Sequence, residues 1–230
     1  NPISKITEEC TIRFSGNRIY SLVNDLSGNI ILYCNITTSN ELEEDLTLNI
    51  KDVRKFTKVL DCIPHSLITL DIDKNTSVIK YKSPEISFKL HLVTERAIRT
   101  AQISLEKMQD LTFDTEFTLS KDKLSDILKG CSFATETNKI YFYSEQGNIY
   151  AELTDKTTQD IDSVTFAVTD KYEGVDITSA LPFSLEILRI LVSNKIDEFR
   201  VKINNTYKLV AFETKTDQSE SKYLIPAMTK

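Results

Sequence analysis

A short segment between Asn49 and Ile63 gathers four basic side chains in a chain whose formal net charge is −6. If the segment is helical, each residue advances by about 100° around the axis, and all four bases fall within an arc of about 100°. Apolar side chains occupy the opposite side. Lys and Arg in such an arc can bind phosphates without reading base sequence. Two interpretations remain: a surface for a polyanion, or the solvated face of an amphipathic helix. The bases are Lys51, Arg54, Lys55 and Lys58, and the apolar residues are Val53, Phe56, Val59, Leu60 and Ile63.

Groups that could perform covalent or metal chemistry are scarce. The two histidines, His65 and His91, have no spacing to a nucleophile or carboxylate that suggests a triad. The sequence contains no GxGxxG, Walker or HExxH motif. The acidic run Glu41–Leu46 lacks the turn glycine of a calcium loop, so a solvated loop is expected. We therefore predict no catalytic residue, no metal, no cofactor and no enzymatic activity. An enzyme whose site is assembled from scattered residues is the least favoured alternative.

The four cysteines also lack metal-ligand spacing. Cys10, Cys34, Cys62 and Cys131 form no CxxC pair. Reduced thiols in a reducing, intracellular compartment are expected.

Composition limits the class of protein. The chain has 230 residues, of which 40% are hydrophobic and 27% charged, as in an ordinary soluble globular protein. No apolar run approaches the roughly 20 residues of a membrane span, so no membrane partner is expected. The negative net charge argues weakly against a general nucleic-acid binder, but it permits one whose bases are concentrated on one surface.

Most of the chain alternates as β-strands do, and three segments predict helices instead. These are Ile50–Cys62, Leu119–Phe133 with Ser120 as N-cap, and Phe183–Val192. The second and third carry fewer bases than the first, and acidic residues are mixed among them. The bases are Lys121, Lys123, Lys129 and Arg189, and the acids are Asp122, Asp126 and Glu186.

The order of the expected elements repeats. A helix, a loop and two strands occur twice, and the strands beginning at Ile68 and Val78 correspond to those beginning at Phe199 and Leu209. Both offsets are 131 residues, which favours a duplication over coincidence. The second copy begins with a helix, so an equivalent helix is expected before Asn1. Between the copies lies an ordered connector with a short helical turn around residues 105–110.

Five stretches carry a resemblance to a known family. "NPISKITEECTIRFSGNRIYSL" resembles the end of a first helix and the first hairpin of a DNA sliding clamp, and "NIKDVRKFTKVL" resembles its second helix. "LSKDKLSDILKGCSFA" and "SALPFSLEILRIL" resemble the helices of a second clamp domain, and "KYLIPAM" the closing strand and tail. The trimeric branch, that of the tailed-phage processivity clamp and proliferating cell nuclear antigen, fits a chain of this length. The absent first helix and the weakly basic last helix depart from the pattern.

The resemblance implies an α+β fold of duplicated clamp domains, with antiparallel sheets outside and amphipathic helices lining a central hole. Residues 1–93 would form the first domain, 94–112 the connector and 113–230 the second domain. It implies a homotrimeric ring around duplex DNA, held without sequence specificity. The helices would present Lys51, Arg54, Lys55, Lys58, Lys121, Lys123, Lys129 and Arg189 to the backbone.

The resemblance also implies two protein interfaces. Ile86, Phe88 and Leu90 would pair with Val164, Phe166 and Val168 of the next subunit in a head-to-tail contact. DNA polymerase and the clamp loader would dock short peptides in an apolar pocket beneath the connector. Its expected lining is Ile103, Leu105, Phe113, Tyr223, Pro226 and Ala227, although these residues could equally serve only to fix the connector. The alternative function is a non-enzymatic β-rich structural or adaptor protein.

Overall fold

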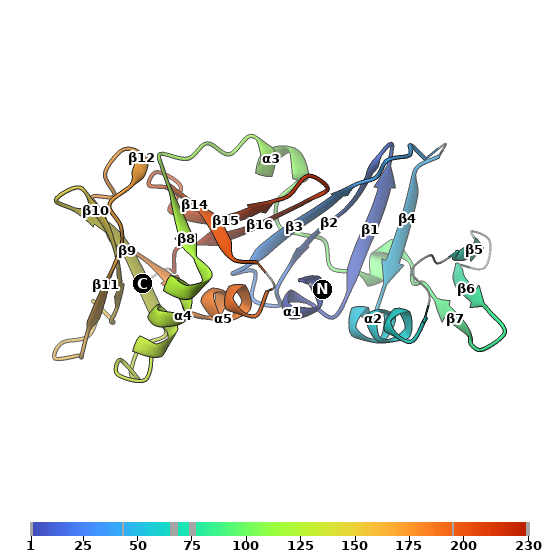
Figure 1. Ribbon diagram of the computed structural model, residues 1–230, viewed down its shortest axis with the longest axis horizontal. Coiled ribbons are helices and arrows are strands. Elements are labelled where there is room, and N and C mark those ends of the chain that lie inside the picture. The colour runs from blue at the N-terminus through green and yellow to red at the C-terminus, as the bar shows by residue number, and fades with distance from the viewer. Residues whose placement is uncertain (1, 43, 65–68, 74–76, 195, 229–230) are drawn as a thin grey trace.

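The computed structural model describes residues 2–42, 44–64, 69–73, 77–194 and 196–228. The molecule is elongated, with helices α4, α5, α1 and α2 along one edge and α3 on the opposite edge (Figure 1). The α-helices are α1 (Ile3–Ile6), α2 (Val53–Asp61), α3 (Leu105–Gln109), α4 (Lys121–Gly130) and α5 (Glu186–Val192), with a 3₁₀ helix η1 (Glu95–Ala97). None of the helices in these ranges combines the length and the apolar character of a membrane-crossing helix.

A nine-stranded antiparallel sheet runs through the middle of the molecule, in the order β12-β8-β14-β15-β16-β3-β2-β1-β4. Its strands from the first part of the chain are β1 (Cys10–Ser15), β2 (Arg18–Asn24), β3 (Ile31–Thr37) and β4 (Leu46–Ile50). Those from the second part are β8 (Thr115–Ser120), β12 (Tyr172–Gly174), β14 (Glu198–Asn204), β15 (Leu209–Lys215) and β16 (Ser219–Pro226). The two parts join where β16 pairs with β3.

Two smaller sheets lie at the ends of the molecule, and β7 and β11 are edge strands of these sheets. One contains β5 (Asp71–Asp73), β6 (Val78–Lys82) and β7 (Ser87–His91), in that order. The other has the order β11-β10-β9-β13, from β9 (Lys139–Glu145), β10 (Asn148–Leu153), β11 (Val164–Thr169) and β13 (Leu181–Ser184). Strands β7 and β11 therefore each have one hydrogen-bonding side without a strand partner among the described residues.

The pairings repeat as the sequence predicts. The series α1, β1, β2, β3, β4, α2, β5, β6, β7 matches the series α4, β9, β10, β11, β13, α5, β14, β15, β16 in order, except that the short strand β12 is inserted between β11 and β13. Every antiparallel pairing within the first series has its counterpart in the second. Strands β6 and β15 begin at Val78 and Leu209, as expected, whereas the predicted start at Ile68 lies outside the described residues.

The central sheet buries both of its faces, with different partners. The helix side belongs to the larger apolar core, which contains Leu32, Phe212 and Tyr223. The other side packs beneath the connector in a smaller cluster around Met108, with Leu224 from β16. Neighbouring residues of one strand thus enter opposite cores, because side chains alternate across a sheet.

All three predicted helix starts are wrong. The helix predicted from Ile50 begins at Val53, because Ile50 is buried in β4 and pairs with Cys10, so Lys51 precedes the helix. The helix predicted from Leu119 begins at Lys121 and ends at Gly130, because Leu119 is buried in β8 and pairs with Phe199. Ser120 is the N-cap, as expected, and its hydroxyl accepts a hydrogen bond from the Lys123 amide. Phe183, predicted to be helical, is buried in β13, and α5 begins at Glu186.

Candidate nucleic-acid interface

Helix α2 forms where the sequence offers a cap and one apolar face. Asp52 precedes the helix, and its carboxylate accepts a hydrogen bond from the Lys55 amide at 2.8 Å. Val53 and Phe56 are buried against the core, while Lys55 and Lys58 are exposed. This burial fixes the apolar side of α2 on the sheet and orients its basic side outward.

The basic face of α2 borders an open hollow of about 700 Å³. Lys51 Nζ lies 2.5 Å from Glu9 Oε2, and Arg54 Nε donates to the carbonyl oxygen of Ser4 at 3.4 Å. All four predicted bases line the hollow and are exposed, so the structure brings them together on one surface. They are Lys51, Arg54, Lys55 and Lys58.

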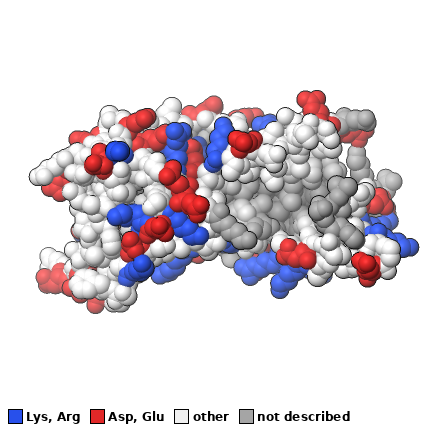
Figure 2. All heavy atoms as spheres, in the orientation of Figure 1, with Lys and Arg blue, Asp and Glu red and all other residues white. Residues whose placement is uncertain are grey.

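The other predicted bases are divided between surface and structural roles. Lys121 is half-buried, and its Nζ donates to the carbonyl oxygen of Asn194 at 2.7 Å. This hydrogen bond holds the side chain of Lys121 against the segment that follows α5. Lys129 is exposed but pairs with Asp126 at 2.8 Å. Lys123 is half-buried and Arg189 is exposed. Among the helices, α2 therefore carries the most concentrated positive charge, although a separate group of basic side chains lies on the same edge near α4 and α5 (Figure 2).

The connector packs on the opposite side of the central sheet. Three predicted pocket residues, Ile103, Leu105 and Phe113, meet in the smaller apolar cluster with Met108 and Tyr33. Lys222 Nζ lies 4.9 Å from the centre of the Phe113 ring, a cation–π contact.

A cavity of about 240 Å³ opens beside the connector cluster. Ile103 and Leu105 line it, together with Tyr20 and Leu22 of β2. Sequence reasoning missed Met108, Tyr20 and Leu22. Their residue types show that they are apolar, but the sequence pattern does not indicate which face of the sheet the connector would cover.

Tyr223 does not belong to this surface, contrary to the prediction. It is fully buried in the larger core, and Asn194 Nδ2 donates to its hydroxyl oxygen at 2.9 Å. Burial raises the pKa of Tyr223 to about 12, so its hydroxyl stays protonated. Ala227 also packs on the larger core. Pro226 shares the face of Leu224, two residues earlier, and so lies on the connector side.

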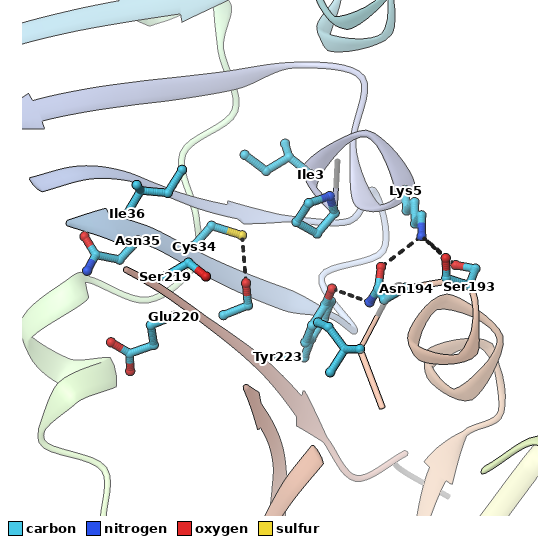
Figure 3. A pocket seen from close by; sticks show the side chains of 13 residues that line it. Ile3, Lys5, Cys34, Asn35, Ile36, Ser193, Asn194, Ser219, Glu220 and Tyr223 are labelled. Carbon is cyan, nitrogen blue, oxygen red and sulfur yellow. Dashed lines mark hydrogen bonds between the residues drawn. The ribbon is translucent and has the colours of Figure 1, made fainter. Parts of the chain in front are cut away.

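Tyr223 instead stabilises the junction between the two parts of the chain (Figure 3). Lys5 Nζ of α1 donates to the carbonyl oxygen of Ser193 at 2.8 Å and to Asn194 Oδ1 at 2.9 Å. Asn194 therefore links α1, the end of α5 and β16 across a hollow of about 700 Å³.

We expect Tyr223→Phe to lower the free energy of unfolding by about 1–3 kcal/mol, because the amide of Asn194 loses a buried partner. Urea unfolding measures the change. Tyr207→Phe, at a position 65% exposed, is the matched control and is expected to have little effect. Equal stability of the two variants would contradict the structural role of Tyr223.

The predicted interface residues lie on the edge strands β7 and β11 and just before β7. Phe88 and Leu90 of β7, and Val164, Phe166 and Val168 of β11, are half-buried and packed against the larger core. Ile86 is half-buried but is not part of that core. The ring of Phe166 packs against Gly130 of α4, where an added Cβ would lie 2.8 Å from the ring.

The whole arrangement is shared with solved structures of low sequence identity. PCNA of A. fulgidus, solved with the C-terminal region of FEN-1 bound, is similar with a TM-score of 0.75 and 17% identity, over 100% of this chain and 93% of that chain. Proliferating cellular nuclear antigen from Entamoeba histolytica is similar with a TM-score of 0.73 and 17% identity, over 99% of this chain and 92% of that chain. The chain has the sliding-clamp fold.

A third structure with this fold is longer. A putative DNA polymerase III beta subunit from Eubacterium rectale is similar with a TM-score of 0.73 and 16% identity, over 100% of this chain and 63% of that subunit. No protein-family model matches the sequence, and no curated protein matches it. The fold is thus found by structural similarity, and the predicted α+β fold class of duplicated clamp domains is confirmed.

Proposed function

We propose that this chain is a subunit of a DNA sliding clamp, a ring that encircles duplex DNA and tethers replication proteins. The observation that carries the proposal is the repeat itself. The internal contact joins β3 to β16, and the two edge strands β11 and β7 are their counterparts in the repeat. A second copy can therefore offer β7 to β11 in the same antiparallel way. Such a head-to-tail contact closes into a ring when the rotation fits, and three chains would supply six repeats.

The register of this contact can be carried over from the internal one. Leu32 faces Tyr223 and Cys34 faces Ser221 across the β3–β16 pair. When the hairpins of the two repeats are aligned, Leu32 corresponds to Val164 and Tyr223 to Phe88, so Val164 would face Phe88 of the neighbouring chain. In the same way Phe166 would face Ile86 of the neighbouring chain. All four residues are apolar and half-buried, and both pairs lie on one face of the strands. A shift by one residue would place apolar side chains opposite polar ones, which supports the predicted interface.

The basic face of α2 supports duplex DNA as the molecule held in the ring. In a ring that turns the helix-bearing edge inward, this face would meet phosphates, and backbone contacts that ignore sequence would permit movement along the duplex. The connector surface, lined by Ile103 and Leu105, is the place proposed for peptides of a DNA polymerase and a clamp loader. A. fulgidus PCNA, of similar fold, has been solved with the C-terminal region of FEN-1 bound.

The decisive experiment tests whether the protein encircles DNA, by comparing its retention on circular and on cut duplexes. We expect the protein to have the mass of three chains in solution and to remain on circular duplex DNA through gel filtration. Cutting the circle should release it, because a ring slides off free ends. An adaptor or structural protein with a basic patch would bind circular and linear DNA equally, and this result, or a strict monomer, would contradict the clamp.

A further inference from the structure

A second hollow opens beside the basic face of α2, between α1, the chain leading into β1, and η1. We name it the connector cleft. Its volume is about 500 Å³, and it shares Glu8, Lys51 and Arg54 with the hollow along α2. Two exposed arginines near the start of the connector, Arg96 and Arg99, also line it. The cationic surface of α2 therefore continues across the cleft onto the connector.

The carboxylate of Glu9 lines the connector cleft and is largely buried there. Glu9 Oε2 lies 2.5 Å from Lys51 Nζ, and Glu9 Oε1 accepts a hydrogen bond from the Arg99 amide at 3.0 Å. Burial raises the pKa of Glu9, but the hydrogen bonds and charges of Lys51 and Arg99 outweigh it and lower that pKa below its ordinary value. Glu9 is thus ionised at neutral pH and serves as an internal anion among the bases.

The cleft keeps an excess of positive charge after Glu9 is counted. Its acidic side chains are Glu8 and Glu9, and its basic side chains are Lys5, Lys51, Arg54, Arg96 and Arg99. The side chain of Lys51 remains 61% exposed despite its ion pair, so an anion from solvent can reach it. Guanidinium groups match the geometry of phosphate oxygens, which makes a phosphodiester a suitable ligand.

We propose that the connector cleft binds a backbone phosphodiester of duplex DNA through Lys51, Arg96 and Arg99, and that Glu9 competes with this phosphate for Lys51. The inference rests on the proposed function, because it extends the DNA-facing surface of α2. It adds two arginines that the sequence analysis did not select. It also assigns Glu9 an opposing role: the ion pair that holds Lys51 in place limits its affinity for DNA.

The first test removes the two arginines. We expect Arg96→Gln with Arg99→Gln to weaken binding of a short fluorescein-labelled duplex at low salt. The slope of log affinity against log salt should become shallower by about 1 for each phosphate that the variant no longer binds. Lys107→Gln with Lys171→Gln, at two exposed positions outside both hollows, is the matched control and should leave the slope unchanged.

The second test removes the internal anion. Glu9→Gln keeps an oxygen that can accept from the Arg99 amide but removes the negative charge that pairs with Lys51. The Nζ of Lys51 then keeps its 3.4 Å hydrogen bond to the Ala97 carbonyl oxygen, and we expect duplex affinity to rise by about twofold to fivefold. Glu106→Gln, which removes one exposed acidic charge on α3, should change the affinity less than Glu9→Gln does. A gain is not expected from a residue with a purely structural role.

The outcomes separate this proposal from the proposed function. Unchanged duplex affinity and salt slope in the double arginine variant would overturn the phosphate site, even if reversing the charges of α2 abolishes binding. Saturable binding of pyrophosphate that the arginine variant loses, with duplex binding intact, would instead identify a site for a free anion and also overturn it. A monomer that still shows both predicted effects would contradict the ring and leave the cleft supported.

Discussion

Reversing the charge of Arg54, Lys55 and Lys58 to Glu is expected to reduce duplex affinity by at least about 100-fold. The slope of log affinity against log salt concentration should also become shallower by about 3. The three side chains are exposed on one face of α2, where each can meet a phosphate. Lys51 is left unchanged because it pairs with Glu9, and a second carboxylate there would disturb the start of the helix. Fluorescence anisotropy with a labelled duplex, over a range of salt, measures both quantities.

The fold should survive this change. The buried contacts of α2 come from Val53 and Phe56, which are untouched. Lys58→Glu, in the last turn of α2, costs about 0.3–1 kcal/mol against the helix dipole, which a domain of this size tolerates. Arg54→Glu and Lys55→Glu lie in the first turn, where the dipole favours a carboxylate. The control reverses three exposed lysines elsewhere, Lys107, Lys171 and Lys208. If both triple variants bind DNA equally, net charge governs binding and the face of α2 has no special role.

Ile86→Asp is expected to dissociate the assembly into single chains at concentrations where the native protein is trimeric. Ile86 is half-buried outside the larger core, and the transferred register places it opposite Phe166 of the next chain. A carboxylate there would remove an apolar side chain from the interface and be desolvated without a partner, at a cost of about 2–3 kcal/mol for each interface. Sedimentation equilibrium measures the mass. Tyr207→Asp, at a position 65% exposed, is the control that should leave the mass unchanged.

Cysteine pairs test the same register directly. Ile86→Cys with Phe166→Cys should form disulfides between chains under oxidation, because residues that face each other across strands have nearby Cβ atoms. Ile86→Cys with Thr165→Cys places the thiols on opposite faces and should cross-link much less. Equal cross-linking of the two pairs would exclude the proposed register, even if the chain is a trimer.

The sequence pattern predicted the repeat well because it depends on local signals. Alternation marked the strands, and turn glycines separated them: Gly16 and Gly147 both have a positive φ in tight hairpins. The basic face of α2 followed from helical periodicity alone. Errors occurred where an apolar strand runs directly into a helix. At Ile50, Leu119 and Phe183 the local composition suits either structure, and pairing with a distant strand decides between them.

Periodicity also failed to predict which side of the sheet each residue of β16 would face. Tyr223 and Leu224 are adjacent, and an alternating pattern does not say which of them enters which core when both faces are covered by apolar segments. The connector covers one face and the helices cover the other, and only the folded chain fixes that arrangement. For the same reason the sequence pattern could place Lys121 on a helix as a candidate DNA-binding base, but it could not show that its Nζ donates to the carbonyl oxygen of Asn194.

The sequence by itself determined the strands, the order of the repeat, the cationic face of α2 and the absence of recognisable catalytic motifs, because each of these depends on residues close together in the chain. The tertiary structure decided which bases remain exposed, that β7 and β11 are left as edges, and that Glu9 lies between Lys51 and Arg99. These features depend on contacts between segments that are distant in sequence, which local periodicity does not encode.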